Sequence, residues 1–233
     1  MRYSRLVPSR NDLRPGDILL LQDTRGNSSI KHKGIRVGQG LTSVKFWRKN
    51  KGQSRYVHAL LWICDGSSRM PDVAEASGAG AVVRTHFLQR GTYRVYHCTD
   101  PDLAEAAAGA ATNWATHGMI NYAKGKAVGS VARSDKMGAH GHQRAQAYGA
   151  QIASTTPAWG DDGAFCSEFV VACYQAAATH LGKGLNGDLL DCDAKHCSVR
   201  ALHDRLFRDA QFSSLGDLDY EDKDVAQRLR TTG

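Results

Sequence analysis

The sequence predicts an α+β fold, and two observations support this class. Short apolar segments bounded by turn residues gather in the first 100 residues, and three helical patterns follow them. Hydrophobic residues make up 42% of the 233 residues and charged residues 23%, as in ordinary globular proteins. Strands clustered in one half of the chain with helices around them are typical of the α+β class.

Five segments have the composition of strands. The first follows the turn sequence RPGD at residues 14–17, and the third and fourth flank a glycine-containing turn at residues 78–80. The second, VHALLWIC, is a strong candidate closed by an Asp-Gly turn. The predicted strands cover residues 18–21, 57–64, 72–76, 81–86 and 93–98.

Three segments have helical patterns. Asp100 is a capping residue and Pro101 suits the first helical position, so we expect an alanine-rich helix that stops at Gly118. Two further helices are predicted at residues 166–180 and 199–209.

Three stretches lack a clear period. Residues 23–55 are polar and basic, and residues 119–160 are rich in Gly, Ala, Ser and His, so both predict long loops. The charged tail at residues 216–233 predicts a loosely ordered end.

Composition also limits location and redox state. No apolar run approaches the ~20 residues of a membrane span, so no membrane span is expected. The basic start has no apolar stretch behind it, which predicts synthesis in the cytoplasm without a Sec signal peptide. The six scattered cysteines are expected to be free thiols.

Positive charge is concentrated at the start of the chain. Residues 1–55 contain 13 Lys or Arg against 3 Asp or Glu, whereas the remainder contains 17 against 20. Such a segment attracts nucleic acid, anionic lipid or an acidic partner. Only Phe46 and Trp47 interleave with these charges, which favours a solvated basic loop, so no nucleic-acid partner is expected.

Two cysteines of the predicted helix at residues 166–180 differ in position. They share one apolar face with Phe169, Val170 and Ala177, and we expect that face to pack on the sheet. Cys173 lies two turns into the helix and is predicted to be an inert core thiol. Cys166 lies in the first turn, where unpaired N–H groups and the helix dipole favour a thiolate, so it is the candidate nucleophile.

A cysteine nucleophile needs a histidine base whose ring is oriented by a polar partner. His58 is unusual because it lies in an apolar strand, and Glu75 is an acid between two alanines. We expect them on neighbouring strands facing Cys166, as a Cys-His-Glu constellation. Alternation places His58 on one strand face with Leu60 and Trp62. The opposite face takes Val57, Ala59, Leu61 and Ile63.

Four motifs in this order resemble a known family. RPGDILL, HALLWI, DVAEASGAGAVV and FCSEFVVACYQ together are similar to the circularly permuted branch of the NlpC/P60 superfamily of papain-like cysteine hydrolases. The resemblance implies a papain-like fold in which an antiparallel sheet packs against helices and the nucleophile begins a helix. It covers roughly residues 13–180, so we expect one catalytic domain with that core and a helical C-terminal extension over residues 181–233.

The resemblance also implies roles and a substrate class. Cys166 would be the nucleophile, His58 the general base and Glu75 the residue that orients the imidazole. Members act on amide bonds in peptidoglycan stem peptides, which predicts an endopeptidase or amidase. The longer segments at residues 23–55 and 119–160 depart from short members, so substrate specificity does not carry over.

The sequence also bears on where such an enzyme would act. A catalytic chain without a signal peptide or wall-binding repeats fits an antibacterial effector toxin exported by a contact-dependent secretion system. Its expected partners are then an immunity protein and the secretion apparatus. Two alternatives stay open: a lipid or protein acyltransferase or thioesterase on the same fold, and a non-catalytic binding protein that uses the basic N-terminal segment.

Two cysteines and a histidine at residues 192–197 have the residue types of a metal site. Cys192, His196 and Cys197 lack a clear fourth ligand and the usual Cys-x2-Cys spacing. His140 and His142 lie in a segment expected to be a solvated loop. The sequence therefore favours incidental thiols and histidines, with no metal or other cofactor.

Overall fold

The computed structural model describes most of the predicted core. It covers residues 10–22, 56–64, 72–78, 80–85, 91–117, 120–123, 134–153 and 163–220. The predicted basic loop at residues 23–55, and the last part of the tail at residues 221–233, lie outside the described residues.

The chain has an α+β fold built on a six-stranded antiparallel sheet. The strands lie in the order β4-β3-β2-β1-β5-β6, so the first strand of the chain lies inside the sheet. All five predicted strands are present within one or two residues of their expected ends. The strands are β1 (Ile18–Gln22), β2 (Tyr56–Trp62), β3 (Asp72–Ser77), β4 (Gly80–Thr85), β5 (Gly91–Cys98) and β6 (Phe212–Tyr220).

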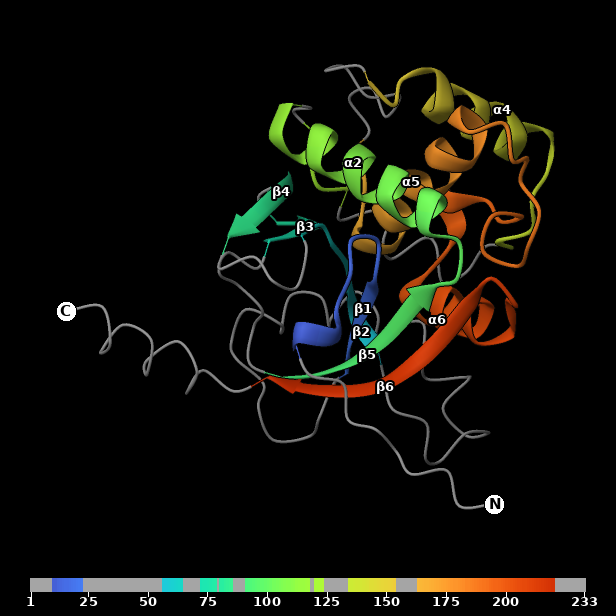
Figure 1. Cartoon of the computed structure of the whole chain (residues 1–233). Coiled ribbons are helices and arrows are strands. Elements are labelled where there is room, and N and C mark those ends of the chain that lie inside the picture. Colours follow the sequence, from blue (N-terminus) through green and yellow to red (C-terminus); the bar gives the residue numbers. More distant parts are fainter. Residues whose placement is uncertain are drawn as a thin grey trace, which may run out of the picture.

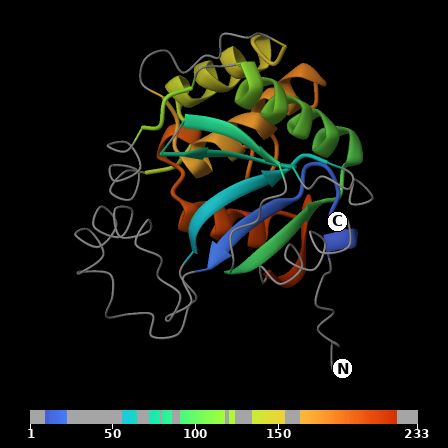
Figure 2. The same cartoon turned by 90° about the vertical axis from the view of Figure 1, so that its left-hand side faces the viewer.

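Four helices pack on this sheet. Figures 1 and 2 show α2, α4 and α5 grouped over one face, while α6 lies further along, where it contacts β2 and β6. The three predicted helices are present, and one was not predicted. The helices are α2 (Pro101–His117), α4 (Ala139–Ala150), α5 (Cys166–His180) and α6 (Val199–Arg208), with short 3-10 turns η1 (Arg10–Asp12) and η5 (Ala194–His196).

Helix α5 is the centre of the core. Every residue from Cys166 to Ala178 is buried, including the polar Ser167, Glu168 and Gln175. The prediction of a single packed face was therefore too narrow: α5 contacts β2 and β3 on one side and α2 and α4 on the other. A helix that is apolar nearly all round is typical of such a central position.

The loop predicted at residues 119–160 is wrong in part, because α4 lies within it. Two glycines that suggest a loop in the sequence are close-packing positions. A Cβ at Gly149 would come within 2.4 Å of the Thr179 side chain on α5, and one at Gly141 within 2.6 Å of Met137. Packing against α5 thus stabilises a helix whose own sequence signals are weak.

The region after α5 is not purely helical, so that prediction is also wrong. It contains β6, which extends the sheet beside β5. The FSSLGDLDY sequence hides a strand because it is short of β-branched residues and contains Gly216 at a φ of 115°. The register of the pair shifts between Val95 and Tyr96, opposite this glycine.

None of the helices among the described residues is both long enough and apolar enough to span a membrane.

Candidate functional site

The loop before α5 is held against a short extended segment at residues 120–123. Ala164 donates its N–H to the Asn121 carbonyl at 2.9 Å, and its own carbonyl accepts from Ala123 at 3.0 Å. Gly163 has a φ of 66°, and a Cβ there would come within 2.2 Å of the Asn121 oxygen. Only glycine fits this close approach, which fixes where the helix and Cys166 begin.

The N-terminus of α5 is left without a side-chain cap. Its N-cap residue is Phe165, which makes no side-chain capping bond. Helix α6 begins differently, because the Ser198 hydroxyl accepts from the Ala201 N–H at 3.2 Å. The first-turn N–H groups beside Cys166 therefore lack the capping oxygen that stabilises α6, and an anion at this position would be stabilised.

His58 follows an irregularity in β2. Leu21 pairs with His58 and Gln22 with Tyr56, so Val57 is an extra residue in the ladder. A bulge of this kind bends a strand and redirects its side chains.

The bulge breaks the predicted alternation at this end of the strand. Ala59 packs with Cys166 in the cluster under the helices, and Leu60 and Trp62 pack in the cluster on the opposite face. Val57 was expected on the Ala59 face but packs against the Leu60 cluster instead. That part of the prediction is wrong, because a strand with an extra residue loses its period of two.

His58 and Glu75 form a buried pair. The His58 Nε2 and Glu75 Oε2 atoms are 2.6 Å apart, and the two residues are only 8% and 2% exposed. The second ring nitrogen, Nδ1, is also buried and bonds to no nitrogen or oxygen atom of the described residues. The thiol of Cys166 is among the groups whose charge acts on this imidazole.

The charge of this imidazole depends on its two partners. Burial lowers the pKa of His58, but the Cys166 thiolate and the Glu75 carboxylate outweigh burial and raise the pKa to about 10. The imidazolium is thus the favoured form of His58 at neutral pH. A cationic imidazole beside a cysteine is the arrangement by which proteins activate a cysteine for nucleophilic attack.

Tyr122 is a fourth member of the site and was not identified from the sequence. It forms an isolated bridge with Ala164, two residues before Cys166. Burial, the charge of Cys166 and the charge of Glu75 all raise its pKa, so its hydroxyl stays protonated close to both groups. The sequence predicts a loop for the segment that contains Tyr122. The sequence feature that could have identified Tyr122 is an aromatic residue two positions after the apolar Ile120.

The other thiols considered above lie away from these partners. Cys173 is fully buried in the core, and burial raises its pKa well above the ordinary value, as expected for an inert thiol. Cys192 and Cys197 lie on the connection between α5 and α6. Within the described part of the chain, no group of three or more His, Cys, Asp or Glu side chains is placed to hold a metal ion.

Comparison of the chain with models of protein families, with curated proteins and with solved structures finds no match. The basis for a function is therefore the meeting of His58, Glu75 and Cys166, which come from two strands and a helix.

Proposed function

We propose that the protein is a cysteine hydrolase that attacks an acyl carbon through Cys166, His58 and Glu75. The observation that carries this proposal is a buried imidazole that bonds to a carboxylate at 2.6 Å and interacts electrostatically with the cysteine at the start of α5. A scaffold protein has no need of this arrangement, because burying a carboxylate and an imidazole costs free energy.

We further propose that the fold is that of the circularly permuted NlpC/P60 branch of papain-like hydrolases. Three features support this: the antiparallel sheet, the order of histidine, acid and cysteine along the chain, and the cysteine at the first position of a helix against that sheet. The motifs that resemble the family lie along β1, β2, the β3-β4 pair and the start of α5.

The reaction would begin with attack of the Cys166 thiolate on the acyl carbon of the substrate. The oxyanion that forms would accept hydrogen bonds from first-turn N–H groups of α5 and from the Tyr122 hydroxyl. The His58 imidazolium then gives its proton to the leaving nitrogen, and a thioester with Cys166 remains. In the second half, neutral His58 takes a proton from water, which attacks the thioester and regenerates the thiolate.

Glu75 has an orienting part in this scheme. Its carboxylate holds Nε2 of His58, which leaves Nδ1 directed to proton transfer at the sulfur and the substrate. It also stabilises the imidazolium, in the way that the third member of a triad does.

The substrate class follows from the family resemblance. We propose an amide bond of a peptidoglycan stem peptide, cleaved by an antibacterial effector toxin that a contact-dependent secretion system delivers and an immunity protein inhibits. The same chemistry on a lipid or protein acyl group is the second candidate, and the test below separates the two.

Purified sacculi incubated with the unsubstituted protein and with the Cys166→Ala variant test the substrate. With the unsubstituted protein only, we expect new, smaller muropeptides whose paired masses sum to the parent mass plus about 18 Da, the mass of one water, per cleaved amide. Iodoacetamide alkylation tests the chemistry separately: Cys166 should react well below pH 8 and lose this reactivity in His58→Ala. Unchanged sacculi with reactive Cys166 would replace the substrate by a lipid or protein acyl group, whereas six sluggish thiols would refute the hydrolase.

A further inference from the structure

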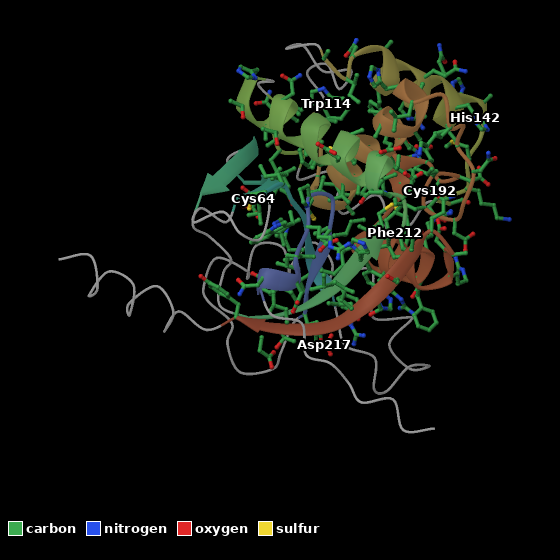
Figure 3. The ribbon with its side chains drawn as sticks, viewed as in Figure 1. Cys64, Trp114, His142, Cys192, Phe212 and Asp217 are labelled. Carbon is green, nitrogen blue, oxygen red and sulfur yellow. The ribbon has the colours of Figure 1, made fainter. Side chains whose placement is uncertain are left out.

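An exposed aromatic ring on α6 forms a second feature outside the proposed active site. Phe207 is 74% exposed, whereas Leu202 and Leu206 of the same helix are buried. The helix ends at Arg208, and β6 begins shortly after it at Phe212, which Figure 3 labels. The ring of Phe207 therefore contributes little to the packing of α6 on the sheet.

Phe207 continues a stack of three rings. The Tyr56 and His203 rings are stacked with their centroids 4.2 Å apart and their planes at 23°, and the His203 and Phe207 rings are stacked at 6.4 Å and 17°. His203 and Phe207 are four residues apart on α6, the spacing at which helical side chains are neighbours. An isolated surface phenylalanine needs no explanation, but a ring that continues a stack presents a flat face in a fixed orientation.

Two tyrosines hold the His203 ring in place behind Phe207. Tyr56 stacks on this ring, and Tyr96 of β5 contacts it edge-on, with the centroids 6.0 Å apart and the planes at 74°. Burial lowers the pKa of His203, so the imidazole is neutral at neutral pH. The surface that supports Phe207 is therefore aromatic, rigid and without charge on its imidazole.

The stack lies next to the proposed active site on two sides. Tyr56 is two residues before His58 on β2, so the stack begins beside the proposed general base. The Ser167 hydroxyl, next to Cys166, donates to the Cys197 carbonyl at 2.7 Å, and Cys197 directly precedes the N-cap of α6. Helix α6 thus borders both the nucleophile and the base.

Charges flank the exposed ring but balance one another. Asp204 lies three residues before Phe207 and Arg208 one residue after it, and both charged side chains are accessible to solvent. Arg208 pairs with Asp188 at 3.2 Å, and Asp204 faces Arg200 at 3.9 Å. Such a surface has hydrogen-bond donors and acceptors but little net charge, which suits a neutral polar ligand better than a charged polymer.

The exposed apolar area is too small for a stable protein interface. Among the residues that the structure describes, the exposed large apolar side chains are Phe207 and Leu181. Leu181 lies just beyond the far end of α5, about 22 Å along the helix axis from Cys166. One aromatic side chain offers roughly 200 Å², whereas a standard protein interface buries about 800 Å² per partner. A ligand of the size of a single ring therefore fits Phe207 better than a second protein.

We propose that Phe207, backed by His203 and Tyr56, is a subsite that stacks on a pyranose ring of the saccharide attached to the stem peptide. The apolar C–H face of the pyranose lies on the phenyl ring, and its hydroxyl and acetamido groups bond to the flanking Asp204 and Arg208. This inference rests on the proposed function, because it places the glycan end of the substrate on α6 while the scissile amide lies at the nucleophile.

Binding is tested without catalysis, in the full chain with Cys166→Ala. The probe is the tetramer of N-acetylglucosamine, and a titration followed by NMR reports on the aromatic side chains. We expect shifts of the Phe207 ring signals, and about 10-fold weaker binding when Phe207→Ala is added, the loss of one stacked ring. Because Phe207 is mostly exposed, its truncation does not threaten folding.

Two further variants serve as controls in the same background. Phe207→Trp keeps an aromatic face and should retain binding. Leu181→Ala is the matched truncation at the other exposed apolar residue, and it should leave the dissociation constant within about 2-fold.

Kinetics with two substrates place the subsite relative to the cleaved bond. A muropeptide that carries its sugars is compared with the same stem peptide without them. In the unsubstituted protein the sugars should lower KM by about 10-fold, and Phe207→Ala should remove this difference. The effect belongs to KM rather than to kcat, because stacking holds the substrate and the transition state equally.

The outcomes separate the subsite from the proposed hydrolysis. A saccharide that leaves the Phe207 signals unmoved, or that binds equally well after Phe207→Ala, would overturn the subsite. A sugar effect on KM that survives in Phe207→Ala would also overturn it. Saccharide binding that depends on Phe207 supports the subsite even if neither substrate is cleaved, a result that would instead count against the proposed hydrolysis.

Discussion

The two cysteines of α5 form an internal comparison. Cys166 is 5% exposed and Cys173 is fully buried, so both lie almost completely inside the protein. They differ in their neighbours: Cys166 meets His58, whereas burial alone dominates the surroundings of Cys173 and raises its pKa. Burial therefore does not separate the proposed nucleophile from the core thiol here, and ionisable partners do.

The largest effect that this comparison predicts is the loss of the nucleophile. Cys166→Ala should reduce kcat/KM on a cleaved substrate by about 10⁴-fold or more, because no thioester can form. Steady-state kinetics on the purified muropeptide measure the loss, and circular dichroism checks that the fold is kept. Activity that survives in Cys166→Ala would remove the distinction between the two cysteines.

Tyr122→Phe should have the next largest effect. Removing one donor to the oxyanion costs about 10²-fold in kcat, with KM little changed. Alkylation of Cys166 by iodoacetamide builds no oxyanion, so its rate should stay within about 2-fold of the unsubstituted protein. An equal fall in both rates would mean that Tyr122 only positions the helix.

Glu75→Gln sharpens the comparison through pH. In the proposed mechanism the imidazolium of His58 is the proton donor, and its pKa is raised to about 10 partly by Glu75, so activity should fall as pH rises through about 10. Without this carboxylate the pKa falls, and the alkaline limb should move to lower pH with a loss of about 10-fold in kcat. A pH profile of kcat/KM from 6 to 11 measures the limb, and an unmoved limb would contradict the orienting role of Glu75.

Cys173→Ala should leave activity nearly unchanged and lower stability instead. Truncation of a fully buried thiol leaves a small cavity, which costs about 1 kcal/mol in the free energy of unfolding. Urea denaturation measures this cost, and initial rates per folded molecule should match those of the unsubstituted protein. A large loss of activity in this variant would show that the two thiols are not independent.

Much of the fold could be predicted from local patterns. The strands around Ile18 and His58 and the helix from Pro101 have apolar content and boundary residues that agree with their final structure. The helix α4 and the strand β6 could not be predicted, because Gly149 and Gly216 read as loop signals. Their structure depends on contacts with α5 and β5, which a single sequence does not specify.

The candidate site was predictable in its residues more than in its geometry. His58 and Glu75 stand out because a polar side chain in an apolar strand costs free energy unless it is paired. Cys166 stands out because the start of a helix favours a thiolate. The bulge at Val57 and the approach of Tyr122 depend on strand register and on the loop at Gly163. Neither leaves a local pattern that separates it from ordinary sequence.

The order in which the sheet is assembled bears on how the protein is made. Arg94 of β5 bonds to Asp217 of β6 across 123 residues of chain, and Tyr174 of α5 donates to the Gly16 carbonyl across 158. Pairings this distant in sequence make folding slow, because long loops must close first. During synthesis β1, β2 and β5 emerge well before α5 and β6. Until then β5 lacks its neighbouring strand β6, and the sheet lacks the helix that covers it. A newly made chain therefore has His58 and Glu75 long before it has Cys166, so a ribosome-bound fragment that ends before α5 lacks the proposed nucleophile.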